Sequence, residues 1–363
     1  MDASLDRLRD LKTLLKLALT TSLLFCLPGC ATLSKDDPVS VGPVHVRTGG
    51  ERAPKEPVGE ADAKLYAEAI LPFARVASRA YCDYLRSNDA QPAECDTSSP
   101  MVEQDGWELL FDSRDALAAE DQRTRLTFLV FYRVHLADPT TGDIVFGFRG
   151  TKLTYASDWN ANLRWITRFL PGSDQYDVLY ANVPGLITRA QKEAFAQKPL
   201  VRRFNVYATG HSLGGGLAQL FAYSDRRVRA AIVFDPSPVT GYRNVVSDAR
   251  VNCDARVLRV YERGEILQYL RSVMRRLYTP TSNVSEVDFN VLHGGFNPIA
   301  NHSIKSFTDR LTKALIALEA RTETAPFDRR ERRIALEDKL PKERDEVCVA
   351  ERMNAVPRQP QQD

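Results

Sequence analysis

Three short apolar runs that alternate with helix-like stretches constrain the fold of this chain more than any other feature of its sequence. The runs are Phe204–Ala208, Ala230–Phe234 and Val257–Tyr261. Strand-length apolar runs joined by helices are typical of parallel sheets that are covered by those helices. We therefore predict an α/β protein with a mostly parallel central sheet flanked by helices on both faces.

Further elements are expected on either side of these runs. Leu126–Leu136 and Ile144–Phe148 are rich in Phe, Val and Tyr, and the Pro- and Gly-containing turn between them predicts a β-hairpin. Ala61–Leu85 predicts a helix packed on one side, with Pro72 as the point where it would break. Apolar residues at helical spacing after Ser303 predict a final amphipathic helix.

Composition divides the chain into four parts. They are a signal peptide (1–29), a Pro- and Gly-rich flexible tether (30–60), the α/β domain (61–320) and a charged, solvated C-terminal tail (321–363). The 49 Lys and Arg residues nearly balance the 47 Asp and Glu residues, so the net charge of +2 gives no reason to expect a nucleic-acid partner.

The N-terminus has the pattern of a secretory signal. Basic residues precede the apolar run Leu17–Leu27, which is shorter than the roughly 20 residues that span a bilayer. The end of the run, Leu27–Cys30, resembles the lipobox of bacterial lipoproteins, although Pro28 replaces a small or aliphatic residue. The resemblance implies lipidation of Cys30 and a lipid-anchored protein of the bacterial cell envelope. Ala31, in place of the Asp of inner-membrane lipoproteins, favours the outer membrane. The alternative is an ordinary signal peptide with an incidental cysteine.

Four cysteines lie beyond this segment: Cys82, Cys95, Cys253 and Cys348. In an oxidising compartment we expect the pairs Cys82–Cys95 and Cys253–Cys348, and the alternative is four buried free thiols. No CxxC spacing supports a zinc or redox site.

Gly210–Gly214 matches the pattern GxSxG between an apolar run and a helix-like stretch. This context predicts a sharp strand-to-helix turn that exposes the Ser212 hydroxyl as a nucleophile and offers the Leu213 N–H to an oxyanion. The competing interpretation is a plain glycine-rich turn.

A serine nucleophile needs a general base and an acid that orients it. His302 directly precedes the final helix and is the expected base, while His293 in a Gly-flanked loop is expected to be structural. For the acid, three carboxylates follow later strands, and we rank them Glu265, Asp235 and Glu262.

Three blocks make the chain similar to the class 3 (fungal-type) lipase family of the α/β-hydrolase superfamily. They are Phe146–Thr151, Asp158–Leu163 and Tyr207–Ala218, and the similarity extends over about Thr127 to Leu318. The resemblance implies that the backbone and hydroxyl of Thr151 bind the oxyanion and that the second block is a lid segment. Two positions differ from the family: Glu265 stands where Asp is usual, and Asp235–Pro238 replaces a Gly-containing segment.

Two surface features are open to two interpretations. The apolar face of Trp159, Leu163, Ile166 and Leu170 is a lid or ordinary core packing. The basic cluster 271–276 contacts phospholipid headgroups or is a solvated helix face.

These features predict a serine hydrolase of carboxylic esters, a lipase or phospholipase that acts on lipid esters through an acyl-enzyme on Ser212. No metal or cofactor is implied, the expected partners are a lipid or small ester and a membrane surface, and no protein partner can be named. The alternatives are a soluble short-ester esterase or thioesterase, and a non-catalytic surface lipoprotein that serves as a scaffold.

Overall fold

The computed structural model describes residues 42–48, 54–82, 102–150, 174–238, 240–245, 248, 251–263, 283–291, 302–322, 336–342, 344–346 and 348–350. The strands are β1 (His45–Arg47), β2 (Glu56–Pro57), β3 (Glu108–Asp112), β4 (Phe128–Val134), β5 (Thr141–Phe148), β6 (Arg203–His211), β7 (Val228–Phe234), β8 (Arg256–Glu262) and β9 (Val284–Phe289). The helices are α2 (Glu60–Cys82), α3 (Ser113–Ala116), α4 (Ala119–Gln122), α6 (Asp174–Gln197), α7 (Leu213–Ser224), α8 (Tyr242–Val245) and α10 (Ile304–Thr322), with a 3-10 turn at Val102–Asp105.

The nine strands form one sheet in the order β2-β1-β9-β8-β7-β6-β5-β4-β3. The five central strands β5 to β9 are parallel, whereas β1 and β2 at one side and β3 and β4 at the other pair antiparallel. The three predicted apolar runs lie in β6, β7 and β8, and the predicted hairpin is the antiparallel pair β4–β5. The sheet is mixed, with four parallel and four antiparallel pairs of neighbouring strands, so the expected mostly parallel sheet is not confirmed. Of the antiparallel pairs, β4 and β5 are joined by a short turn, which requires no crossover helix.

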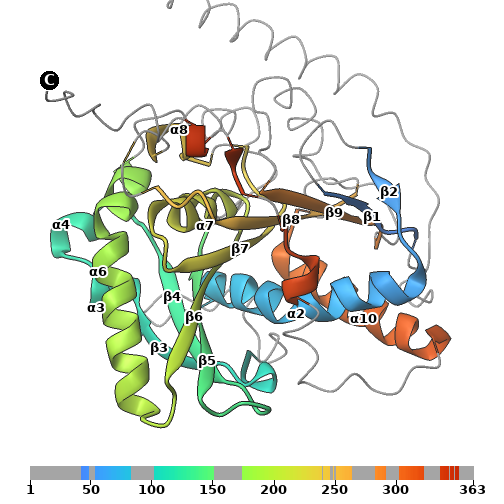
Figure 1. Cartoon of the computed structure of the whole chain (residues 1–363), viewed down its shortest axis with the longest axis horizontal. Helices are drawn as coiled ribbons and strands as arrows, with labels where there is room; N and C mark the ends of the chain where they lie inside the picture. Colours follow the sequence, from blue (N-terminus) through green and yellow to red (C-terminus); the bar gives the residue numbers. More distant parts are fainter. Residues whose placement is uncertain are drawn as a thin grey trace, which may run out of the picture. The chain divides into compact units, whose positions relative to one another are not determined.

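Helices cover both faces of this sheet (Figure 1). Alternate residues of β4 point to opposite faces, as the two-residue period of a strand requires. Phe128 and Val130 join the cluster that contains side chains of α6 and α7, while Leu129 and Phe131 join the cluster of α2 and α10.

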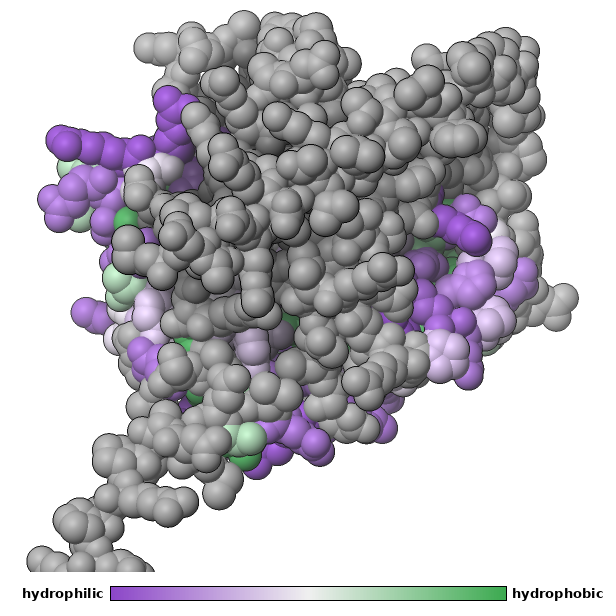
Figure 2. All heavy atoms as spheres, turned by 90° about the horizontal axis from the view of Figure 1, so that it is seen from above, coloured by the Kyte–Doolittle hydropathy of each residue, from purple (hydrophilic) through white to green (hydrophobic). Residues whose placement is uncertain are grey.

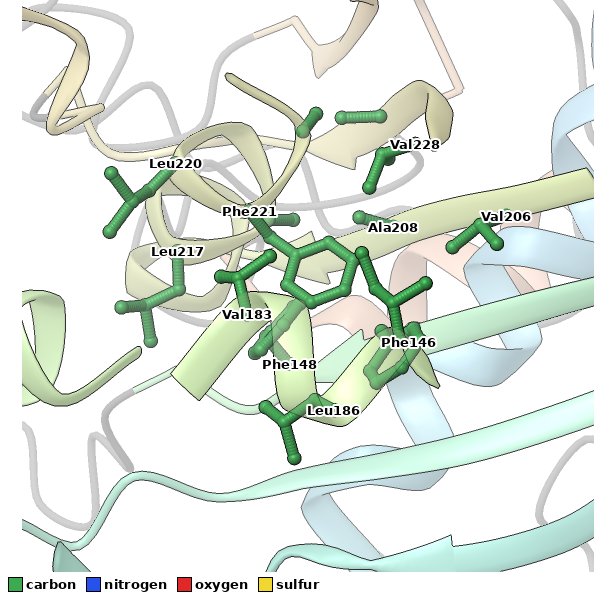
Figure 3. Close-up of a cluster of buried hydrophobic side chains, with 14 of the residues drawn as sticks. Phe146, Phe148, Val183, Leu186, Val206, Ala208, Leu217, Leu220, Phe221 and Val228 are labelled. Carbon is green, nitrogen blue, oxygen red and sulfur yellow. The ribbon is translucent and has the colours of Figure 1, made fainter. Parts of the chain in front are cut away.

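The aromatic centre of the first cluster lies directly beneath helix α7 (Figure 3). The ring of Phe221 on α7 packs 4.5 Å from Phe146 and 5.4 Å from Phe148, measured between centroids. Val183 and Leu186 on α6 complete the contact in the same view. This packing holds α7 against β5 and β6, so the turn that connects β6 to α7 is rigidly supported.

Helix α2 continues through Pro72, so the expected break is wrong. A proline inside a helix costs about 3 kcal/mol. The helix also buries Ile70, Phe73 and Val76 fully, and each such side chain contributes about 1.5–3 kcal/mol. Burial of this face therefore outweighs the local defect.

Residues expected in the flexible tether belong partly to the sheet. Strand β1 pairs with β9, and the buried guanidinium of Arg47 forms an ion pair with Glu286 of that strand. The sequence did not predict β1 or β2 because strands of two or three residues are too short to show a period.

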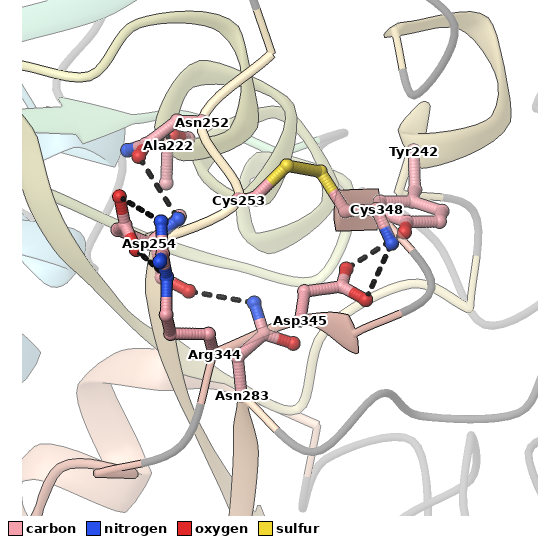
Figure 4. The surroundings of a disulfide bond; sticks show 10 residues. Ala222, Tyr242, Asn252, Cys253, Asp254, Asn283, Arg344, Asp345 and Cys348 are labelled. Carbon is pink, nitrogen blue, oxygen red and sulfur yellow. Dashed lines mark hydrogen bonds and ion pairs between the residues drawn. A yellow bond between two sulfur atoms is a disulfide. The ribbon is translucent and has the colours of Figure 1, made fainter. Parts of the chain in front are cut away.

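The C-terminal segment expected to be solvated also packs on the domain. Leu336 and Leu340 are buried in the cluster of α2 and α10, and a disulfide joins Cys348 to Cys253 across 95 positions (Figure 4). The backbone N–H of Cys348 donates to Asp345, whose own N–H donates to the Cys253 carbonyl. This confirms the expected pair Cys253–Cys348, whereas Cys95, and with it the other pair, lies outside the described residues.

The described residues visible on the face in Figure 2 are mostly hydrophilic, with hydrophobic ones only in small spots. In the part of the chain that the structure describes, no helix combines the length and hydrophobicity needed to cross a membrane.

Candidate functional site

Ser212 stands at the turn between β6 and α7 with φ 56° and ψ −123°. A positive φ in a residue with a side chain is strained and is characteristic of the nucleophile turn after a strand. Backbone hydrogen bonds hold the turn against the end of β7, since Ser212 N–H donates to Phe234 O at 3.1 Å and Ser237 N–H donates to Ser212 O at 2.9 Å. The Ser212 side chain does not cap α7, so its hydroxyl makes no capping hydrogen bond to the helix.

Glycines allow the end of β5 to approach this turn closely. A Cβ atom at Gly214 would lie 2.2 Å from the carbonyl oxygen of Phe148, and one at Gly210 would lie 2.4 Å from the carbonyl oxygen of Gly214. A Cβ at Gly150 would lie 2.7 Å from the carbonyl oxygen of His211. The chain therefore enters position 151 directly beside the serine turn, although Thr151 itself lies outside the described residues.

Tyr81, near the end of α2, connects these two segments. Its hydroxyl accepts a hydrogen bond from Gly150 N–H at 3.1 Å and donates to the carbonyl oxygen of His211 at 3.3 Å. The same hydroxyl lies 3.3 Å from Nδ1 of His211. Sequence reasoning missed Tyr81 because it is 130 positions from the motif and nothing in its local sequence marks it.

An imidazole–carboxylate cluster lies at the ends of the neighbouring strands. His211 pairs with Phe234 in the register of β6 and β7, so Ser212 and Asp235 follow adjacent strand ends. One ligand-type atom from each of His211, Asp235 and His302 lies within 4.8 Å of the other two. The centroids of the two imidazole rings are 4.5 Å apart, and all three side chains are buried. The structure thus brings the predicted histidine His302 close to the second-ranked acid Asp235, and Ser212 follows the strand next to the one that Asp235 follows.

The carboxylate of Asp235 is held by the adjacent strand. Its Oδ1 accepts a 3.0 Å hydrogen bond from the N–H of Glu262, and its own N–H donates to the carbonyl oxygen of Val260 at 2.8 Å. Asp235 also has a positive φ of 38°, the second strained residue of the site. The hydrogen bond from the Glu262 N–H fixes the Asp235 carboxylate against the end of β8.

Glu262, the third-ranked acid, is engaged elsewhere. Nε and Nη2 of Arg310 on α10 donate to its two carboxylate oxygens at 2.7 and 2.6 Å. Its side chain is fully buried, and this bidentate pair ties β8 to α10. Several other predicted residues lie outside the described part of the chain: Cys30, Thr151, the lid segment 158–170, Glu265, the basic cluster 271–276 and His293.

The sequence matches no protein-family profile and no curated protein. Among solved structures, lipase II from Rhizopus niveus is similar at 16% identity, with 63% of this chain and 78% of that chain covered and a TM-score of 0.33. The Rhizomucor miehei lipase in complex with its propeptide is similar at 16% identity, with 70% and 74% covered and a TM-score of 0.36. Both TM-scores are low, and neither similarity carries an argument about the function of this chain.

Proposed function

We propose that this protein is a serine hydrolase of carboxylic esters with Ser212 as the nucleophile. The observation that carries the proposal is the cluster at the carboxyl edge of the sheet: an imidazole, His302, within 4.8 Å of a carboxylate, Asp235, that directly follows the strand beside the strained Ser212 turn. The chain order serine, acid, histidine is that of α/β-hydrolases.

In this mechanism His302 accepts the proton of the Ser212 hydroxyl while the oxygen attacks the ester carbonyl carbon. The negative charge on the carbonyl oxygen is stabilised by the N–H of Leu213, the first residue of α7, together with Thr151. Amides in the first turn of a helix have no partner within the helix and carry the positive end of its dipole. His302 then returns the proton to the leaving alcohol, and water releases the acid from Ser212 by the same steps in reverse order.

For the orienting acid we propose Asp235 in place of the first-ranked Glu265. The support is its distance to His302 and the hydrogen bond from the Glu262 N–H, which fixes the carboxylate. A buried, ionised carboxylate beside an imidazole holds the ring in the tautomer that accepts the serine proton and stabilises the imidazolium.

For the substrate we propose esters of lipids. The support comes from the sequence: the three blocks that resemble class 3 lipases, and the lipobox-like Leu27–Cys30 that would keep the domain at a membrane. We also propose the cell envelope, and within it the outer membrane, as the location. A lipidated Cys30 would bury acyl chains at about 0.8 kcal/mol per methylene group.

The central test is labelling of the full chain with a fluorophosphonate probe, which reacts with activated serines. The wild-type protein should be labelled stoichiometrically, and Ser212→Ala should not be labelled. The matched control is Ser224→Ala, since Ser224 is a buried serine of α7 whose hydroxyl donates to Leu220 O at 2.6 Å. Label on Ser212→Ala would reject Ser212 as the nucleophile, and a wild-type protein that stays unlabelled would reject the hydrolase and favour a non-catalytic lipoprotein.

Two further measurements test substrate and location. A rate on emulsified long-chain esters or phospholipid vesicles above that on soluble short-chain esters or thioesters supports a lipase, and the opposite order supports an esterase. For the anchor, a bacterial host grown with radioactive palmitate should label the wild-type chain and Cys26→Ser but not Cys30→Ser. Equal labelling of both variants would contradict anchoring at Cys30.

A further inference from the structure

The cluster of His211, Asp235 and His302 has a second chemical property besides its part in ester hydrolysis. The two imidazoles and the carboxylate come from three places in the chain. His211 ends β6, Asp235 directly follows β7, and His302 lies two residues before the start of α10. One donor atom from each lies within 4.8 Å of the other two, and all three side chains are at most 5% exposed.

This donor set matches the requirements of a transition-metal ion. Nitrogen and oxygen ligands lie about 2.0–2.2 Å from tetrahedral zinc, which puts them about 3.3–3.6 Å from one another. The three donor atoms therefore need to approach by only on the order of 1 Å. Three protein ligands with a fourth position left for water is a common zinc arrangement, and imidazole selects Zn²⁺ or Cu²⁺ over Mg²⁺ or Ca²⁺.

Tyr81 supports the same arrangement from outside the cluster. Its hydroxyl lies 3.3 Å from Nδ1 of His211, and a hydrogen bond at one ring nitrogen is what orients a metal-binding imidazole. With Nδ1 against this hydroxyl, Nε2 is the ring nitrogen of His211 that would bind the ion. The N–H of Glu262, which donates to Asp235, orients the third ligand in the same manner.

We infer that His211, Asp235 and His302 form a binding site for a zinc-type divalent ion. Binding ties up the His302 nitrogen and the Asp235 oxygen, so the ion is a reversible inhibitor of ester hydrolysis. The inhibition rests on the proposed function, whereas the binding itself does not. Metal occupancy and catalysis exclude one another because they use the same lone pairs.

The test measures Zn²⁺ binding to the full chain, without a histidine tag, by calorimetry. The wild-type protein should bind one Zn²⁺ per chain, and Mg²⁺ should not compete. Loss of an outer-shell partner alone weakens metal binding by about 10–100-fold, so removal of a ligand in His211→Gln should weaken it by at least about tenfold.

His135→Gln is the matched control. Nε2 of His135 lies 2.8 Å from a carboxylate oxygen of Asp143, but the guanidinium of Arg133 shares that oxygen and opposes a cation. This variant should bind Zn²⁺ like the wild type. Equal affinity of His211→Gln and wild type, or an equal loss in His135→Gln, would overturn the site.

A readout without a variant covers the case in which His211→Gln does not fold. The electron paramagnetic resonance spectrum of the Cu²⁺-loaded wild-type protein should show coupling to two imidazole nitrogens. Coupling to fewer than two would refute the ligand set.

Probe labelling separates this inference from the proposed function. Fluorophosphonate labelling that Zn²⁺ blocks in the wild type supports both. Zn²⁺ binding that depends on His211, in a chain that the probe never labels, supports the metal site and rejects the hydrolase. Labelling that Zn²⁺ does not affect, without binding, supports the hydrolase and rejects the metal site.

Discussion

The backbone N–H of Gly150 donates a 3.1 Å hydrogen bond to the hydroxyl of Tyr81, and this contact joins the end of α2 to the segment that leads into Thr151. The same hydroxyl donates to the carbonyl oxygen of His211, one residue before the proposed nucleophile. One phenol therefore sets the spacing between the two segments that would supply the oxyanion donors.

Tyr81→Phe should lower turnover by up to about tenfold. A single hydrogen bond contributes about 0.5–1.5 kcal/mol, and about 1.4 kcal/mol corresponds to a factor of ten in rate. Tyr132→Phe is the control, because Tyr132 also donates through its hydroxyl, to Glu108 at 2.6 Å, but on β4 away from the serine turn. Ester-hydrolysis kinetics and melting temperatures of both variants distinguish a positioning role of the hydroxyl from a purely structural one. If both variants lose stability but keep their turnover, Tyr81 has no positioning role.

Substitution of each of the three candidate acids should affect turnover and stability differently. Asp235→Asn should reduce turnover by about 10³–10⁴-fold with little change in stability, because the amide holds His302 in the wrong tautomer. Glu262→Gln should instead destabilise the fold by about 3 kcal/mol, because it leaves the guanidinium of Arg310 without its bidentate partner. Glu265→Gln should change neither quantity. Steady-state kinetics and urea unfolding measure both, and a large loss of turnover in Glu265→Gln alone would restore Glu265 as the acid.

Gly214→Ala should impair both folding and activity. The new Cβ would lie 2.2 Å from the Phe148 carbonyl oxygen, and overpacking of this kind costs about 1–3 kcal/mol. Gly185→Ala in α6 is the opposite case, since the added methyl group would have no other atom within 4 Å apart from those of its chain neighbours and its own helix backbone. It should stabilise the protein by about 1 kcal/mol through helix propensity. Thermal melts measure the change in stability of each variant. A Gly214→Ala variant more stable than the wild type would contradict the close approach of Gly214 to the Phe148 carbonyl oxygen.

Loss of the disulfide should cost about 2–5 kcal/mol of unfolding free energy. The bond closes a loop of 95 positions, and long loops restrict the unfolded chain most. Cys253→Ser, Cys348→Ser and the double variant should show the same loss, because each removes the same bond. Urea unfolding with and without reductant measures it. Losses that add in the double variant would show that the two thiols act separately.

Asp143 should make stability fall at acidic pH. Burial acts to raise the pKa of its carboxyl, but the His135 hydrogen bond and the charges of Arg133 and His135 lower it to about 2. A folded pKa below the unfolded value near 3.9 contributes stability that is present above about pH 4 and is lost as the pH falls toward 2. The contribution is on the order of 2 kcal/mol. Unfolding curves from pH 5 to 2 should show this decrease in the wild type but not in Asp143→Asn, and parallel curves would contradict it.

Local patterns in the sequence predicted much of the fold and part of the site. The apolar runs lie in β6, β7 and β8, and the hairpin and the first and last helices form where their periods indicate. The strained turn at Ser212 follows the same rule, because its strand, its glycines and its helix are all within a few residues of one another. Such interactions depend on near neighbours, and near neighbours are visible in a sequence.

Contacts between distant segments were decided by the tertiary structure. Glu337 lies in the segment expected to be solvated. It forms ion pairs with Arg229 of β7 at 2.6 Å and with Arg256 of β8 at 2.8 Å. The charge-rich sequence around Glu337 does not reveal these partners. Strand β1 joins the sheet through β9, which is more than 230 positions away in the sequence. The energy of these contacts comes from partners that are adjacent only after the sheet has formed.

The site divides in the same way. The sequence by itself determined which residues are candidates for catalysis, Ser212 and His302 among them, since side-chain type and the turn around the serine are local properties. Only the tertiary structure decided that Asp235 faces His302, that Glu262 pairs with Arg310, and that Tyr81 contacts the serine turn. The register of parallel strands and the packing of α2 and α10 set these distances, and both arise from burial of apolar surface over the whole domain.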